Sequence, residues 1–149
     1  MKNYQLKDHK NNLVELNNLV GTKGLVLFFY PKAKTSLCTL EVIEYQKHLD
    51  QFKALGFNVV GVSQDESNKN DEFCCEQNLS FLLLSDLNKD LVKEFNLTSE
   101  TIILDNEPFV KYERSTFVLD NQLNLVKEFR NVDHIEHVND LLEYLKKND

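Results

Sequence analysis

The stretch LVLFFYPKAKTSLC at positions 25–38 carries the strongest structural signal in this chain. Its first six residues, 25–30, are all apolar or aromatic, which is typical of a strand buried on both faces of a sheet. Pro31 ends the strand because its ring fixes φ and it has no N–H to offer a neighbouring strand. The polar residues after it include Thr35 and Ser36, candidate N-caps that predict the start of a helix.

The predicted helix has one apolar stripe and ends at Gly56, a residue suited to a left-handed C-cap. Cys38 lies at the N-terminus of this helix, where free N–H groups and the helix dipole favour a thiolate. The same residue also lies on the apolar stripe, so a small core side chain is the competing interpretation. The stripe consists of Cys38, Val42, Tyr45, Leu49 and Phe52.

The 149 residues have the composition of an ordinary soluble globular domain, 42% hydrophobic and 28% charged. We expect one domain over residues 1–149. The net charge of -7 argues against a partner that is a nucleic acid or an anionic membrane. The sequence contains no apolar run long enough to span a bilayer and no signal-peptide core at its start, so we expect a cytoplasmic protein.

Three cysteines, Cys38, Cys74 and Cys75, do not make a structural disulfide framework. In a reducing compartment such thiols are buried, catalytic or redox-sensing. The chain has four histidines but no Cys-x-x-Cys or His-Glu-x-x-His spacing. We therefore expect neither a metal site nor a cofactor.

Predicted strands and helices alternate along the chain, after an N-terminal hairpin and before a second hairpin and a last helix. This order favours right-handed crossovers and a sheet covered on both faces. It predicts an α/β protein with a thioredoxin-like fold, a mixed central sheet flanked by helices, and an N-terminal β-hairpin extension. The predicted strands are 4–6, 13–16, 25–30, 57–62, 81–84, 115–119 and 123–129, and the predicted helices are 38–56, 67–78, 87–95 and one after Asp133.

Two parts of the chain carry weak signals. The helix at 67–78, with Ser67 as its candidate N-cap, contains few large apolar residues, so we expect it to be poorly anchored. After the third helix the sequence predicts only a short strand at 102–104 and a turn at 105–108.

The last helix begins with a capping box, in which Glu136 follows Asp133 by three residues. Its apolar stripe is buried, and His134 and His137 fall at the edge of that stripe. We therefore expect both histidines to be exposed rather than to bind a metal.

The residues around Cys38 match a known pattern. Pro31, Thr35 and Cys38 occupy every defined position of P-x-x-x-T-x-x-C, and the later segment that begins at Arg114, RSTFVLD, resembles a second signature of the same family. The chain thus resembles the peroxiredoxins over nearly its whole length. The segments CTLE at 38–41 and LSD at 84–86 resemble the bacterioferritin comigratory protein subgroup, also called PrxQ-like.

The resemblance implies a thiol peroxidase that reduces hydrogen peroxide and organic hydroperoxides. Cys38 is then the peroxidatic cysteine, which attacks the O–O bond and becomes a sulfenic acid. Thr35 holds the thiolate and the peroxide, Arg114 favours the thiolate and stabilises the breaking bond, and Pro31 shields the pocket. If the chemistry is absent, Thr35 is only an N-cap, Pro31 only stops a strand, and Arg114 pairs with Glu113 or a surface carboxylate.

The resemblance offers more than one position for a resolving cysteine, the residue that forms a disulfide with the first. Many members of the subgroup carry it five residues after the first cysteine, where this chain has Ile43. Others carry it on the next helix, which matches Cys74, and Cys75 is the adjacent alternative. If Phe73 faces the core, Cys74 lies about 100° around the helix and Cys75 about 200° around, toward solvent.

The resemblance also implies that a disulfide between Cys38 and Cys74 is reduced by thioredoxin and that the protein is a monomer. In the reduced fold we expect the two cysteines to lie too far apart to bond, so that helix ends unwind on oxidation. Two alternatives stay open: a one-cysteine cycle resolved by an external thiol, and a non-enzymatic thioredoxin-like redox sensor.

Overall fold

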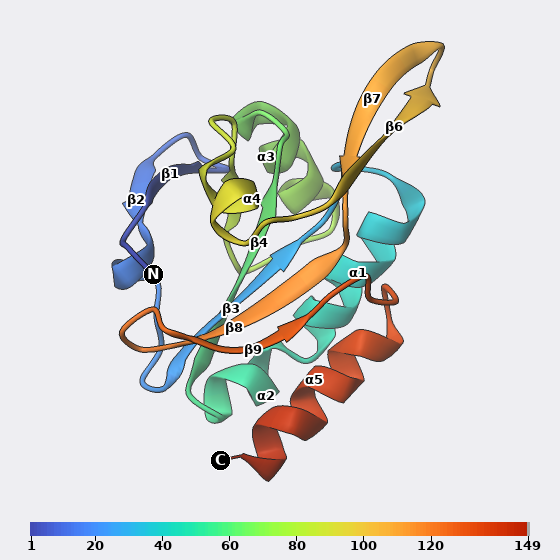
Figure 1. Cartoon of the computed structure of the whole chain (residues 1–149). Coiled ribbons are helices and arrows are strands. Elements are labelled where there is room, and N and C mark those ends of the chain that lie inside the picture. The colour runs from blue at the N-terminus through green and yellow to red at the C-terminus, as the bar shows by residue number, and fades with distance from the viewer. Residues whose placement is uncertain (149) are drawn as a thin grey trace.

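The computed structural model describes residues 1–148, in which a seven-stranded sheet is covered by helices (Figure 1). The strands are β1 (Gln5–Asp8), β2 (Leu13–Glu15), β3 (Gly24–Phe29), β4 (Phe57–Ser63), β5 (Leu83–Ser85), β6 (Ser99–Leu104), β7 (Glu107–Tyr112), β8 (Ser115–Asp120) and β9 (Leu125–Phe129). The helices are the short 3-10 helix η1 (Leu16–Asn18) and the α-helices α1 (Ser36–Lys47), α2 (Leu49–Ala54), α3 (Ser67–Glu76), α4 (Asp90–Glu94) and α5 (Glu136–Lys147).

The sheet has the strand order β2-β1-β5-β4-β3-β8-β9. Its centre is parallel, because β4 pairs with both β3 and β5 in parallel. Its two sides are antiparallel, since β8 pairs with β3 and the N-terminal hairpin β1–β2 is added beside β5. This confirms the predicted thioredoxin-like α/β fold with a mixed sheet and an N-terminal hairpin extension.

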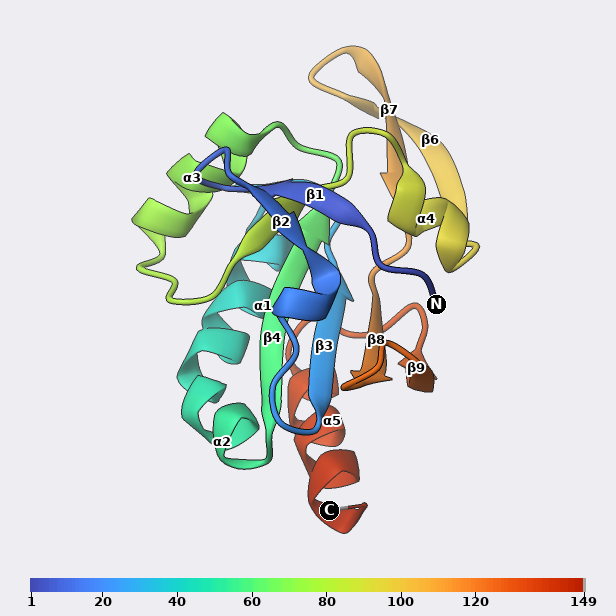
Figure 2. The same cartoon turned by 90° about the vertical axis from the view of Figure 1, so that its left-hand side faces the viewer.

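Both faces of β3 are buried, as its continuous apolar sequence predicts. Val26 and Phe28 pack in the core formed with α1, α2, α3 and α5. Leu25 and Leu27 pack on the opposite face, with residues of α4, η1 and β1. Alternate residues of a strand point to opposite faces, so one strand supports two cores. In Figure 2 the N-terminal hairpin and η1 lie in front of β3 and β4.

The helix predicted at 38–56 is in fact two helices. The backbone turns at His48 (φ -105°, ψ 10°), and the N–H of this residue is shared between the carbonyl oxygens of Glu44 and Tyr45. No proline or glycine marks this corner, so the sequence did not reveal it. The five residues of the apolar stripe are nevertheless all buried, and Gly56 has the predicted left-handed backbone, with φ of +90°.

Two predicted helix starts need correction. Thr35 occupies the N-cap position of α1, but its hydroxyl donates to the carbonyl oxygen of Lys32 (2.7 Å) and does not cap the helix. Ser67 is the first residue of α3, and Glu66 precedes it at the cap position. In both places the helix begins close to the predicted residue, but the predicted side chain does not cap it.

The helix predicted at 87–95 is shorter and begins at Asp90. Leu87 is 53% exposed and lies before the helix. The carboxylate of Asp86 accepts hydrogen bonds from the N–H groups of Leu91 and Val92, which fixes the start of α4. An acidic side chain at this end also suits the helix dipole.

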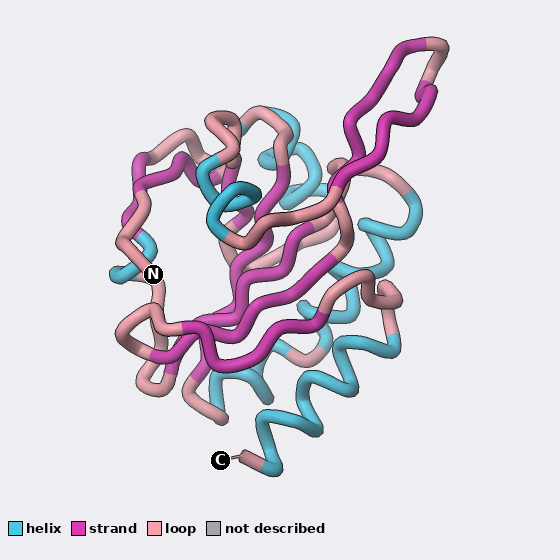
Figure 3. The backbone as a smooth tube through the Cα atoms, in the orientation of Figure 1, coloured by secondary structure: helices cyan, strands magenta, loops and turns pink. Residues whose placement is uncertain are grey.

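The segment between α4 and β8 contains a hairpin that the sequence only partly predicts. β6 and β7 pair along their full length and form a separate two-stranded sheet that projects from the body (Figure 3). The turn consists of Asp105 and Asn106, both with positive φ, as a two-residue hairpin turn requires. None of the residues in these two strands is buried, and no clear alternation of apolar and polar residues marks them in the sequence.

No helix within residues 1–148 combines the length and the apolar character needed to cross a bilayer.

Candidate active site

Cys38 lies in the first turn of α1 and is 1% exposed. The chain reaches it from the C-terminal end of the central strand β3 through the loop 30–35. This position gives a buried sulfur next to the unpaired N–H groups of a helix N-terminus. The thiol is free.

Arg114 lies between Cys38 and a buried carboxylate. Its Nη2 donates to the Sγ of Cys38 at 3.2 Å, and its Nη1 donates to the Oε1 of Glu41 at 2.6 Å. The sheet register explains this arrangement, because Ser115 at the start of β8 pairs with Phe29 at the end of β3. The residue before β8 therefore lies beside the segment that leads to Cys38.

The alternative in which Arg114 pairs with Glu113 is wrong. Glu113 accepts hydrogen bonds from Thr98 and Ser115 and forms an ion pair with Arg130 (3.3 Å). Its side chain thus lies on the other side of the chain from the thiol, since neighbouring residues in an extended segment alternate in direction.

Glu41, in the segment CTLE, is a site residue that was not predicted. It is 0% exposed, and burial raises the pKa of its carboxyl to about 8 although Arg114 acts in the opposite direction. Its second oxygen, Oε2, has no hydrogen-bond partner within residues 1–148. The available signal was its spacing, because a residue three positions after Cys38 on a helix lies on the same side.

The predicted exposure of His137 is wrong. This residue is 4% exposed, and its Nε2 lies 2.7 Å from the hydroxyl of Tyr45 and 3.0 Å from that of Thr116. The pKa of His137 is lowered to about 4, mainly by burial and in addition by the nearby Arg114. His137 Nε2 also lies 3.8 Å from Glu41 Oε2. A row of polar side chains therefore runs from the Cys38 thiol through Arg114 and Glu41 to His137 in the core.

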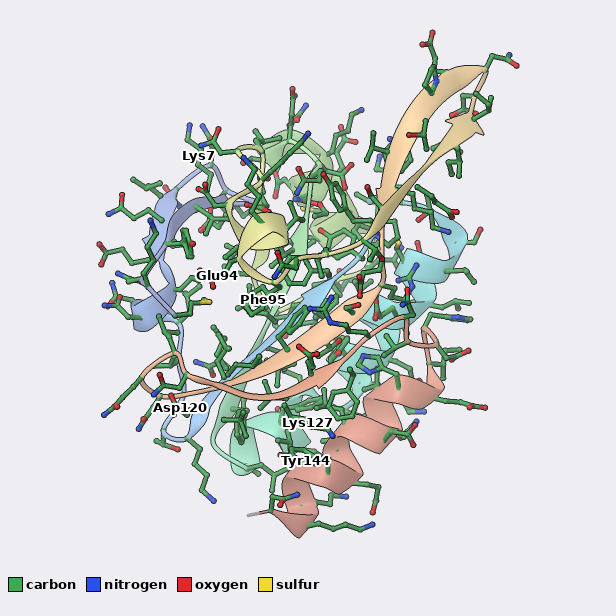
Figure 4. All side chains as sticks on the ribbon, in the orientation of Figure 1. Lys7, Glu94, Phe95, Asp120, Lys127 and Tyr144 are labelled. Atoms are coloured by element: carbon green, nitrogen blue, oxygen red, sulfur yellow. The ribbon has the colours of Figure 1, made fainter. Side chains whose placement is uncertain are left out.

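The burial of His137 follows from the docking of α5. The ring of Phe129 on β9 lies 6.2 Å from the His137 ring and 6.0 Å from that of Tyr144. Figure 4 labels Tyr144 and shows Lys127 of β9 beside it; the Lys127 amine lies 5.7 Å from the Tyr144 ring. The edge of the apolar stripe is thus covered by β9. His134, two residues before the helix, is half-buried, so its predicted exposure is also wrong. Asp133 acts as predicted in part, since its carboxylate accepts the N–H groups of Ile135 and Glu136.

A pocket of about 200 Å³ opens beside the thiol. Pro31, Thr35, Cys38 and Arg114 all line it, so the structure brings the four predicted residues together. The hairpin β6–β7 supplies an apolar wall that was not anticipated. This wall consists of Ile102, Leu104 and Phe109.

Cys74 and Cys75 face in different directions. Cys75 is exposed, as predicted, whereas Cys74 is 7% exposed and belongs to the same core as Cys38 rather than to its boundary. The Cys74 thiol lies 3.5 Å from the carbonyl oxygen of Leu79, and burial raises its pKa. All three thiols are free.

The sequence matches known proteins along most of its length. A model described as the AhpC/TSA family matches residues 1–128. Peroxiredoxin Bcp of Bacillus subtilis (strain 168) is 35% identical over 142 residues, which cover 95% of this chain and 89% of that protein.

Solved structures show the same similarity. A structure of the Xanthomonas campestris bacterioferritin comigratory protein, described with its alkyl peroxide reduction activity, matches with a TM-score of 0.85 and 28% identity over 97% of this chain and 91% of that one. Two mutants of Xanthomonas campestris peroxiredoxin Q match with a TM-score of 0.85 and 29% identity, and cover 97% and 98% of this chain and 90% and 92% of theirs. Each mutant replaces one cysteine by serine, at positions 36 residues apart in that protein.

Proposed function

Because this chain belongs to the AhpC/TSA family and is a peroxiredoxin of the bacterioferritin comigratory protein type, we propose that it reduces hydroperoxides through the thiol of Cys38. The observation that carries this proposal is the 3.2 Å contact between Arg114 and the Cys38 sulfur, in a pocket that Pro31 and Thr35 also line.

The first step is attack by a thiolate. Most thiols are protonated at neutral pH, so the Arg114 guanidinium and the N–H groups at the start of α1 favour the anion. The Cys38 sulfur attacks the terminal oxygen of ROOH, an S–O bond forms and the O–O bond breaks. The alkoxide leaves with the bonding electrons and takes up a proton, and Cys38 becomes a sulfenic acid. Arg114 stabilises the negative charge that develops on the leaving oxygen.

Thr35 and Pro31 position the peroxide. The Thr35 hydroxyl uses its proton in the bond to the Lys32 carbonyl oxygen, so its lone pairs are the groups left to face the pocket. They can accept the O–H of a hydroperoxide and orient the terminal oxygen toward the sulfur. Pro31 adds no hydrogen-bond donor to this wall and limits the access of water.

We assign the second step to Cys74, with Cys75 as the alternative. The Cys74 sulfur attacks the sulfenic acid, the S–S bond forms, and the oxygen leaves as water. The separation of 36 residues between Cys38 and Cys74 equals the separation of the two cysteines mutated in the Xanthomonas campestris protein. A dithiol such as thioredoxin then reduces the disulfide.

Each thiol has a different contact in this structure, Cys38 with Arg114 and Cys74 with Leu79. Disulfide formation therefore requires at least one of them to leave its place. We further propose that the enzyme acts as a monomer in the cytoplasm, where thioredoxin is available.

The decisive experiment is peptide mapping without reductant after one equivalent of hydrogen peroxide. We expect Cys38 and Cys74 in one disulfide-linked peptide pair, and no peroxide consumption by the Cys38→Ser variant. A bond from Cys38 to Cys75 moves the resolving role by one residue. The absence of an internal bond, with peroxide still consumed, supports resolution by an external thiol, and activity in Cys38→Ser refutes the proposal.

A further inference from the structure

The loop before Cys38 is bonded to the segment that carries Cys74. Loop 30–35 and segment 65–76 lie far apart in sequence on either side of β4, yet four polar contacts join them. These contacts, here called the clasp, are Tyr30–Asn70 (2.6 Å), Ala33–Asp65 (2.8 Å), Lys34–Glu72 (2.6 Å) and Lys34–Glu76 (3.2 Å).

The inner half of the clasp is centred on Asn70, which is 0% exposed. Its Oδ1 accepts the hydroxyl proton of Tyr30 and faces the hydroxyl of Ser63 (3.3 Å), and its Nδ2 donates to the hydroxyl of Ser85 (3.3 Å). These partners lie at the C-terminal ends of β3, β4 and β5. One side chain of α3 therefore ties the helix to three strands, one turn before Cys74.

The expectation that α3 is poorly anchored is wrong, because Asn70 attaches the helix to the ends of three strands. Phe73 is the one large apolar side chain that α3 buries, and its ring packs against Tyr30 at 5.8 Å between centroids. The buried amide supplies the rest of the attachment. Buried polar groups need their partners, so the helix leaves this position only when all three bonds of Asn70 break together.

The outer half of the clasp is an exposed ion-pair cluster. Lys34, four residues before Cys38, has the left-handed φ of 69° and reaches both Glu72 and Glu76. The two carboxylates lie two residues before and two residues after Cys74. Contact with Lys34 lowers the pKa of Glu72, as expected for an ion pair. This cluster spans the gap between the two segments whose cysteines react.

We propose that the clasp holds α3 and the Cys38 loop in their reduced arrangement and sets the rate at which Cys74 reaches oxidised Cys38. This inference rests on the proposed resolving role of Cys74. At least one thiol must leave its contact before the S–S bond forms, and the clasp opposes this movement because it holds the loop before Cys38 to the segment that carries Cys74. While it stays closed, the sulfenic acid survives and a second hydroperoxide can oxidise it to sulfinic acid, with one more alcohol released.

A charge swap on the outer half tests the proposal without disturbing the core. The variants are Lys34→Glu, the double variant Lys34→Glu with Glu72→Lys, and the control Lys53→Glu, which makes the same charge change at an exposed position of α2, outside the clasp. Each reduced protein receives one equivalent of hydrogen peroxide, is quenched at millisecond intervals with an alkylating reagent, and is analysed by intact mass. This separates the sulfenic acid from the disulfide at every time point.

We expect Lys34→Glu to speed disulfide formation by about two- to five-fold, the range that exposed ion pairs allow. The double variant should return most of the way to the wild-type rate, and Lys53→Glu should match the wild type. The peroxide concentration that gives half-maximal sulfinic acid should rise in Lys34→Glu by the same factor. Asn70→Ala should act in the same direction by about ten-fold or more.

Hydrogen exchange on the reduced proteins provides a second readout. Amides of residues 67–76 should exchange faster in Lys34→Glu and return toward the wild type in the double variant. If the wild type forms the disulfide, but Lys34→Glu shows the same rate of disulfide formation and the same amide exchange as the wild type, the clasp proposal is overturned. The proposed function then stays intact. The absence of a disulfide between Cys38 and Cys74 in the wild type would refute the resolving role of Cys74, and the inference with it.

Discussion

Replacing Glu41 with glutamine should change how the stability of the protein depends on pH. Glutamine has nearly the same shape and still offers an oxygen to the Nη1 of Arg114, but it cannot ionise. In the wild type, burial raises the pKa of Glu41 from 4.5 to about 8. Folding therefore takes up a proton at Glu41 wherever the pH lies between these values.

The sign and size of the effect follow from this shift. A group whose pKa is raised on folding stabilises the protein most below its unfolded pKa, and this stability is lost as the pH rises through the folded value. One proton corresponds to about 1.4 kcal/mol per pH unit. Between pH 5 and pH 7 the free energy of unfolding of the wild type should fall by about 3 kcal/mol relative to Glu41→Gln.

His137 makes the comparison with the variant necessary. Burial lowers the pKa of His137 to about 4, so its contribution to stability is lost as the pH falls below 6.5. Between pH 4.5 and 6.5 this opposes the effect of Glu41, and the raw wild-type curve can look flat. The difference between the two proteins cancels His137 and isolates Glu41.

The assay is urea unfolding followed by far-ultraviolet circular dichroism at pH 5, 6, 7 and 8, with reductant present. The chain has no tryptophan, so fluorescence is less suitable. If the difference in unfolding free energy between wild type and Glu41→Gln is the same at all four pH values, Glu41 is ionised throughout. The argument that burial outweighs Arg114 is then wrong.

Three further outcomes are expected. Arg114→Ala should slow the reaction of Cys38 with peroxide by about a hundred-fold and should also slow its alkylation by iodoacetamide at neutral pH. Equal rates in both proteins would remove Arg114 from the reaction. Cys74→Ser should still consume one equivalent of peroxide but should not turn over with thioredoxin. The neighbouring control Cys75→Ser should behave like the wild type. The reverse result would exchange the roles of the two cysteines. Phe109→Ala should raise the KM for cumene hydroperoxide by several-fold, on the order of one lost apolar contact, with little change for hydrogen peroxide; equal changes for both substrates would mean that the hairpin wall does not touch the alkyl group.

The central part of the fold was predictable because its signals are local. The apolar run at 25–30, the proline after it and the helix with a cysteine in its first turn lie within one short segment. The predicted burial of β3 is confirmed. The pairing of Arg114 with the segment around Cys38 followed only from the family resemblance, since it depends on the register of β8 against β3.

The parts that the sequence did not predict depend on long-range polar contacts. Asn70 and His137 are polar residues that a pattern analysis places on the surface, yet each is buried among hydroxyl groups from other elements. Glu41 is buried because Arg114, 73 residues later in the chain, lies against it. Hydrophobic periodicity contains no information on such pairs, since it records which face of a helix is apolar and not what that face meets.

The hairpin β6–β7 was predicted only in part, and its position affects how this enzyme can change. Its strands contact mainly each other, while the reacting thiol and its arginine belong to the seven-stranded body. The wall of the pocket and the reactive groups are thus built by separate parts of the chain. Substitutions at Ile102 or Phe109 can alter which hydroperoxides fit without altering the acidity of the thiol. The peroxide preference can therefore change while the reactivity of the thiol stays the same. Directed evolution of a new peroxide preference should begin in this hairpin.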